Sequence, residues 1–138
     1  MNNLLKIIKQ RTFLLLFGIT LAAAFVRLIQ IQSIPASLYW DEVSIGYNAY
    51  SIITTGKDEY GTFLPILFKG YNDYKMPGAI YLTSLATGLF GMNEFAVRFP
   101  SALFGVLTVF VTFFLVKQLF EKQEMRFDRT HLALLTSF

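Results

Sequence analysis

Three side chains in the middle of the sequence have the types that proton transfer and phosphate binding require. Asp41 precedes a segment with helical spacing, and a helix N-terminus favours an ionised carboxylate, which can act as a general base without a histidine. Lys75 lies between Tyr74 and Met76, where its ammonium group could bind a lipid phosphate. Arg98 precedes a long apolar run, and its guanidinium group suits bidentate phosphate binding. These residue types predict a base at Asp41 and phosphate contacts at Lys75 and Arg98.

Each of the three residues also has a purely structural interpretation. Asp41 is a candidate N-cap of the helix that follows, a role worth about 1 kcal/mol and common for acids. Lys75 is equally well explained as a snorkelling anchor at the head-group level. Arg98 could simply mark a helix end. The spacing leaves both interpretations open, and for Asp41 it favours the cap.

The segment after Asp41 has the spacing of an aromatic helix that stops at Gly56. Intervals of 4, 3 and 3 residues place four side chains on one helical face: Val43, Tyr47, Tyr50 and Ile53. Glycines and prolines then divide residues 56–78 into turns and short extended pieces. Asp58 and Glu59 are expected to be solvated acids in one of these turns.

Aromatic side chains gather in the same part of the sequence. The only Trp, Trp40, lies here with all seven tyrosines: Tyr39, Tyr47, Tyr50, Tyr60, Tyr71, Tyr74 and Tyr81. An aromatic belt at the lipid–water interface explains most of them. A sugar-binding surface is the alternative, because aromatic faces stack on pyranose rings. The candidates for sugar or lipid contact are Tyr39, Trp40, Tyr47 and Tyr74.

Composition excludes several other kinds of protein. Hydrophobic residues make up 54% of the 138 residues and charged residues 15%, so neither a disordered chain nor an ordinary soluble domain fits. The chain has no Cys, and its one His, His131, has no partner for a histidine-rich metal site or a Ser–His–Asp triad. The pI of about 9.2 does not indicate nucleic-acid binding, because the basic residues lie at the edges of apolar runs. That distribution indicates a membrane protein.

Two apolar runs have the length of membrane spans, which need about 20 helical residues. The expected spans are residues 12–31, with Arg27 snorkelling near the end, and residues 99–118. A third run starts at residue 131 and continues to Phe138, so we expect the chain to be the N-terminal fragment of a larger membrane protein. A cleavable signal peptide is the alternative for the first run, but its apolar pattern continues beyond the Ala22–Ala24 cleavage-like site.

Basic residues at the flanks predict which side of the membrane each segment faces. Three precede the first run: Lys6, Lys9 and Arg11. Four follow the second: Lys117, Lys122, Arg126 and Arg129. Both flanks are expected in the cytoplasm, which requires an even number of crossings. Glycine, proline and hydroxyl side chains lower the apolar content of residues 76–93, so we expect an interfacial helix there. Residues 32–98 then form one outside loop.

An ordered set of motifs resembles the start of a known family. The set is Trp40-Asp41-Glu42, an aromatic helix ending in Thr55-Gly56, then Asp58…Gly61…Leu64-Pro65, Tyr74-Lys75-x-Pro77, and Phe90-Gly91-x-x-Glu94-Phe95-Ala96-x-Arg98-x-Pro100-Ser101. This order is similar to the GT-C membrane glycosyltransferases, in the branch of protein O-mannosyltransferases and lipid A aminoarabinose transferases. The resemblance covers about residues 10–138. One departure is Met76-Pro77-Gly78, where many relatives have paired prolines.

The resemblance implies an all-α integral membrane protein, here the N-terminal part of a polytopic bundle with surface-lying helices in the outside loop. It implies inverting transfer of a sugar from a polyprenyl-phosphate donor to a hydroxyl of a glycan, lipid or protein acceptor at the outer membrane face. Asp41 would be the general base and Glu42 a supporting acid, while Lys75 and Arg98 would bind the donor phosphate. A second acidic site residue of the family lies in a later outside loop, beyond Phe138.

The resemblance implies no redox cofactor and leaves a divalent metal open, with no metal ligands assigned. The expected partners are membrane lipid, the polyprenyl-phosphate sugar and the acceptor, without nucleic acid. The expected location is a prokaryotic plasma membrane, with the N-terminus in the cytoplasm. The competing hypothesis is a non-catalytic membrane sensor or assembly subunit with an aromatic outside loop. A permease fragment is a weaker alternative, because residues 99–116 carry only three hydroxyl side chains.

Overall fold

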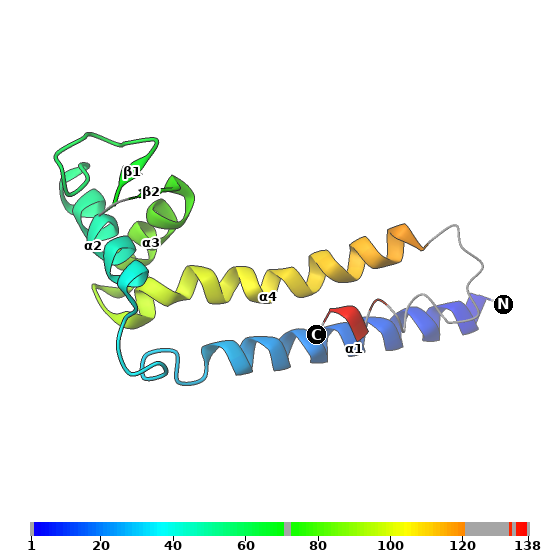
Figure 1. The fold of residues 1–138 in the computed structure, drawn as a ribbon. Coiled ribbons are helices and arrows are strands. Elements are labelled where there is room, and N and C mark those ends of the chain that lie inside the picture. Colours follow the sequence, from blue (N-terminus) through cyan, green and yellow to red (C-terminus); the bar gives the residue numbers. More distant parts are fainter. Residues whose placement is uncertain (1, 71–72, 121–132, 134, 138) are drawn as a thin grey trace. The chain divides into compact units, whose positions relative to one another are not determined.

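The computed structural model describes residues 2–70, 73–120, 133 and 135–137. The chain divides into two compact units, one made of Met1–Ile29 with Leu103–Phe138 and the other of Gln30–Ala102. Four helices and two short strands follow one another along the described residues (Figure 1). This mostly helical composition confirms the helical part of the prediction.

The first unit contains the apolar helices. They are α1 (Asn2–Leu28) and the greater part of α4 (Glu94–Leu119). Among the described residues, Gln10–Leu28 and Glu94–Leu119 are long and apolar enough to cross a membrane, with hydropathies of 1.7 and 2.2. Leu16 and Ala23 of α1 pack in one buried cluster with Val109 and Phe113 of α4 and with Ala133. Most other apolar side chains of these helices are exposed, as suits helices whose solvent is lipid.

The observed spans differ from the predicted ones at their ends. Helix α1 stops at Leu28, before the predicted end at residue 31, because the chain turns there and Gln30 adopts a φ of 55°. Helix α4 starts at Glu94, before the predicted residue 99, because the Asn93 side chain accepts the N–H of Ala96 at 2.8 Å and caps the helix. Of the predicted third span, residues 131, 132, 134 and 138 lie outside the described residues.

The second unit positions the candidate site. Helices α2 (Trp40–Thr55) and α3 (Pro77–Phe90) lie side by side, and β1 (Phe68–Lys69) pairs antiparallel with β2 (Tyr74–Lys75) close to them (Figure 1). Their shared core contains Ala49, Ile52, Phe68 and Ile80, with Ile45 and Tyr81 packed against it. This core connects the strand pair, which contains Lys75, to α2, which contains Asp41.

The N-terminus of α2 corrects the capping prediction for Asp41. The helix begins at Trp40, with Tyr39 as the N-cap residue in an extended conformation. Glu42, not Asp41, provides the side-chain bond of this turn, because its Oε2 accepts the backbone N–H of Tyr39 at 2.9 Å. Asp41 is inside the first turn, where the helix dipole favours a negative charge. N-capping of α2 therefore does not explain why position 41 carries an acid.

The opposite end of α2 and its aromatic face agree with the predicted spacing. Gly56 ends the helix with a φ of 72°, and its N–H donates to the Ile52 carbonyl at 2.9 Å. The four predicted side chains do share one face, and all are exposed: Val43, Tyr47, Tyr50 and Ile53. The buried face instead carries mostly small or polar side chains, namely Ser44, Gly46, Asn48 and Ala49, together with the apolar Ile52.

Helix α3 agrees with the predicted interfacial helix. Pro77 occupies its first turn, where a missing N–H costs no hydrogen bond, and Gly91 follows its last residue with a φ of 78°. Fourteen residues span about 21 Å, less than the bilayer core of about 30 Å. Its length is therefore that of a helix that does not cross, and its position on the outer face stays a prediction.

The turn after α2 corrects the prediction for Asp58. This acid is only 6% exposed, and its Oδ1 accepts the backbone N–H groups of Tyr60 and Thr62 at 3.0 and 2.7 Å. Asp58 thus organises the turn from inside, because unpaired backbone donors would be costly there. Glu59 is exposed, as predicted.

Candidate active site

Asp41 and Lys75 lie in direct contact. Lys75 Nζ is 2.5 Å from Asp41 Oδ1, although 34 residues separate them in the sequence. The Asp41 side chain is 57% exposed, whereas the Lys75 side chain is 14% exposed. The structure therefore brings together the predicted base and one predicted phosphate ligand. The carboxylate of the base is accessible to solvent.

Lys75 belongs to β2, whose pairing with β1 fixes the backbone at this residue. A second acid, Asp73, lies 3.4 Å from Lys75 Nζ. The hydrogen bond that Lys75 donates to Asp41 raises the pKa of Lys75 above its ordinary value of 10.5, with Asp73 adding to the effect and burial opposing it. Lys75 is therefore a cation throughout the physiological pH range. These two contacts occupy two of its three N–H donors among the described residues.

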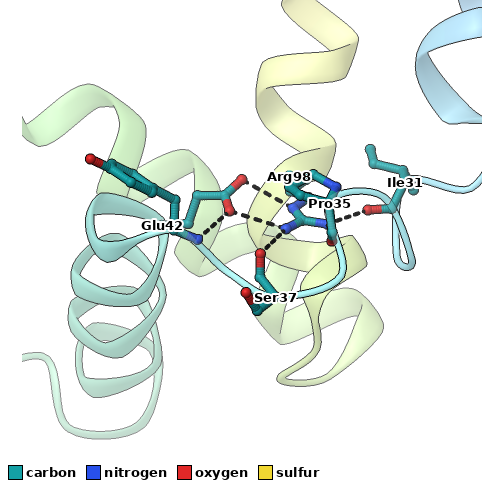
Figure 2. Close-up of polar contacts among 6 residues, drawn as sticks. Ile31, Pro35, Ser37, Glu42 and Arg98 are labelled. Atoms are coloured by element: carbon teal, nitrogen blue, oxygen red, sulfur yellow. Dashed lines mark hydrogen bonds and ion pairs between the residues drawn. The ribbon is translucent and has the colours of Figure 1, made fainter.

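Arg98 and Glu42 form a separate ion pair. Arg98 Nε donates to Glu42 Oε1 at 3.0 Å, and Nη2 donates to Oε2 at 3.2 Å (Figure 2). These bonds from Arg98 hold the pKa of Glu42 below its ordinary value of 4.5, with the Tyr39 N–H contributing and burial opposing. The geometry is the bidentate pairing that guanidinium and carboxylate groups favour.

The remaining N–H donors of Arg98 bind backbone carbonyl groups. Nη1 donates to the oxygens of Ile31 and Pro35 at 2.9 and 3.1 Å, and Nη2 donates to that of Ser37 at 2.9 Å (Figure 2). All five donors of the guanidinium group are thus used, and the residue is 7% exposed. This arrangement favours a structural role for Arg98 over the predicted phosphate contact, because a phosphate would have to displace protein acceptors.

The four aromatic candidates are all exposed, with side chains accessible on the second unit: Tyr39, Trp40, Tyr47 and Tyr74. Trp40 and Tyr47 line a cavity of about 540 Å³. Its other lining residues are Leu38, Val43, Ser44 and Glu59. Tyr39 and Tyr74 are not among the lining residues, so the structure brings together only two of the four.

Sequence reasoning missed Asn48 as a residue that shapes this region. Asn48 is 1% exposed and bonds to both the side chain and the backbone of Glu59. An amide side chain within an apolar helix was the available signal, because a buried amide needs partners. Among the described residues, no group of three or more His, Asp or Glu side chains is placed to hold a metal ion.

Comparison with known proteins assigns the chain to a family. Residues 9–127 match the family model described as dolichyl-phosphate-mannose-protein mannosyltransferase. No curated protein and no solved structure matches the chain. The match confirms the predicted resemblance and implies a membrane glycosyltransferase with a lipid-linked sugar donor, and it does not favour a sensor or assembly subunit. The matched range is well over half of the sequence, and the chain therefore belongs to the dolichyl-phosphate-mannose-protein mannosyltransferase family.

Proposed function

We propose that the protein transfers a sugar from a polyprenyl-phosphate donor to an acceptor hydroxyl at the outer face of the membrane, with inversion at the anomeric carbon. Asp41 is the general base, and Lys75 binds the donor phosphate. The observation that carries this assignment is the contact of 2.5 Å between an exposed carboxylate and the ammonium group of a lysine whose side chain is mostly covered. It sets a proton acceptor beside a fixed positive charge.

The two groups suit a single displacement. The acceptor oxygen forms a bond to the anomeric carbon while the bond from that carbon to the phosphate oxygen breaks. The hydroxyl proton passes to Asp41, and the electron pair leaves with the polyprenyl phosphate. Attack opposite to the leaving group inverts the anomeric configuration.

Lys75 suits the leaving-group role better than Arg98. Its third N–H donor has no partner among the described residues, whereas all five donors of Arg98 have protein acceptors. A fixed cation beside the phosphate stabilises the charge that develops as the bond breaks. Glu42 supports the site indirectly, by holding Arg98 and the first turn of α2, which carries Asp41.

The test is Asp41→Asn in the membrane-embedded protein, with transfer and donor binding measured in parallel. Loss of a general base typically lowers the rate by about 10² to 10⁴. We expect such a loss with donor binding and expression retained, since Glu42 and not Asp41 supplies the side-chain bond at the start of α2. Near wild-type turnover of Asp41→Asn would rule out the catalytic assignment.

Asp73→Asn is the matched control. It also removes a carboxylate that contacts Lys75, but at 3.4 Å and from a side chain that is 61% exposed. We expect nearly unchanged transfer. Equal losses in the two variants would mean that neutralising Lys75, and not accepting a proton, is the role of Asp41.

A further inference from the structure

The cavity beside α2 has the dimensions of a ligand site. Its volume of about 540 Å³ lies within the range of about 300–1,000 Å³ found for small-molecule pockets. One wall is the side of α2 that carries Trp40, Val43, Ser44 and Tyr47, spaced 3, 1 and 3 residues apart. Glu59, from the turn that follows α2, contributes a carboxylate. All the lining residues belong to the second unit.

Partly buried hydrogen bonds with Asn48 hold the Glu59 carboxylate in place, although Glu59 itself is exposed. Asn48 Nδ2 donates to Glu59 Oε1 at 3.0 Å, and the backbone N–H of Glu59 donates to Asn48 Oδ1 at 3.2 Å. Asn48 Nδ2 also donates to the Ser44 carbonyl at 3.1 Å, which fixes the amide on α2. Glu59 Oε2 has no partner among the described residues. The cavity therefore presents a positioned acceptor oxygen.

The lining groups match a neutral ring that carries hydroxyl groups. The aromatic side chains of Trp40 and Tyr47, which are 62% and 56% exposed, offer faces to the apolar side of such a ring. The Glu59 carboxylate and the Ser44 hydroxyl can bind ring hydroxyls. A carboxylate repels phosphate, so the anionic part of a donor belongs at Lys75 instead.

We infer that this cavity is a subsite for a pyranose ring, with Glu59 as the residue that binds its hydroxyl groups. The inference rests on the proposed function, which supplies a sugar as the ligand. Trp40 directly precedes Asp41, and Ser44 follows Asp41 by three residues on a neighbouring side of the helix. A ring in the cavity therefore lies within one helical turn of Asp41, which is not itself a lining residue. The ring belongs either to the donor or to a glycan acceptor.

The test uses the fluorescence of Trp40, obtained as the difference between the protein and its Trp40→Phe variant. Titration with methyl α-mannoside should change this signal saturably. Glu59→Gln keeps the shape of the side chain but removes its charge. It should lower the affinity for methyl α-mannoside by about 10-fold, since hydrogen bonds to charged groups are stronger than those between neutral groups. Glu94→Gln, the same substitution at an exposed acid outside the cavity, should leave the affinity unchanged.

Two further probes show whether the bound ring belongs to the donor or to a glycan acceptor. A polyprenyl-phosphate mannose that changes the signal at lower concentration than methyl α-mannoside identifies the donor ring. A soluble mannose oligosaccharide that does so identifies a glycan acceptor. No response to any sugar would overturn the subsite, and so would an equal response to polyprenyl phosphate without a sugar, because the cavity would then bind lipid.

The subsite and the proposed function can fail separately. Asp41→Asn should lower the rate of transfer by about 10² to 10⁴ and leave the Trp40 response intact. If the wild-type protein transfers sugar while Trp40 does not respond, the subsite is wrong and the function stands. If Trp40 responds to sugar while the wild-type protein shows no transfer, the function is wrong and the subsite stands.

Discussion

Asp41 and Glu42 are adjacent in the sequence and have different cationic partners. Successive helical residues point about 100° apart, so Asp41 reaches Lys75 while Glu42 reaches Arg98. In the pair with Lys75 the Asp41 carboxylate is exposed, whereas in the other pair Glu42 binds the buried guanidinium group of Arg98. The sequence singled out the two acids and both cations as candidates, but their pairing depends on contacts across 34 and 56 residues, which no local pattern reveals.

The Glu42–Arg98 pair predicts a loss of stability in acid. The pKa of Glu42 is lowered in the folded protein, so the contribution of the pair is complete above about pH 4.5 and is lost as the pH falls through the folded value. Glu42→Gln should unfold at lower temperature than the wild type at pH 7. The difference between their unfolding midpoints in detergent should shrink as the pH falls below 4.5. A difference that stays constant from pH 7 to pH 3 would contradict this account.

At the scale of the elements, the spacing along α2 predicted which side chains share a face but not which face is buried. Its spacing placed four apolar and aromatic side chains on one face, and the structure exposes that face. Apart from Ile52, the buried side chains are small or polar, because close helix packing requires small side chains and Asn48 satisfies its amide internally. The rule that apolar faces point inward assumes water outside, and this chain carries helices fit for a membrane.

The helix ends were predictable where one residue decides them. Gly56 and Gly91 end α2 and α3 in left-handed or otherwise unusual conformations, and Pro77 opens α3. The start of α2 was not predictable to the residue, since Asp41 and Glu42 are both suitable acids and only the Tyr39 contact selects Glu42. The Arg98 contacts were not predictable either, because three of the acceptors are carbonyl groups of an irregular segment.

Close packing at Gly46 of α2 leads to a prediction about stability. A Cβ added there would lie 2.9 Å from Val97 Cγ2 and 3.4 Å from Met92 Cε. Gly46→Ala should therefore cost about 1–3 kcal/mol through overpacking. Gly78→Ala in α3 is the control, because its Cβ would meet nothing within 4 Å and alanine favours a helix. Thermal unfolding should show a lower midpoint for Gly46→Ala only, and equal midpoints would show that Val97 moves aside freely.

At the scale of the whole molecule, the chain combines two helices fit to cross a membrane with a unit that carries the candidate site. Lys and Arg residues flank the apolar runs and predict that residues 32–98, within this unit, face outside. A donor whose lipid tail lies in the bilayer presents its phosphate at head-group level, where Lys75 would then lie. The orientation therefore decides on which side of the membrane transfer takes place.

Cysteine labelling tests this orientation, and the 138 residues contain no native Cys to interfere. Met76 and Met92 flank α3 and are 77% and 50% exposed. Met76→Cys and Met92→Cys should both react with an impermeant thiol reagent in intact cells, since α3 is expected not to cross. Gln10→Cys and Leu119→Cys should react only after permeabilisation. Labelling of position 76 with protection of position 92 would mean that α3 crosses the membrane.

The contacts of Arg98 carry a consequence for how freely relatives can vary. Three of its five hydrogen bonds end on main-chain oxygens of Ile31, Pro35 and Ser37, atoms that every amino acid supplies. Residues 31–37 can therefore change in sequence without loss of these hydrogen bonds, provided that the backbone keeps its conformation. Glu42 has no such freedom, because its two contacts with Arg98 come from the side chain. Among diverging members of the family, position 42 should change only together with position 98, whereas the segment between the first span and Tyr39 should vary in sequence and hold its shape.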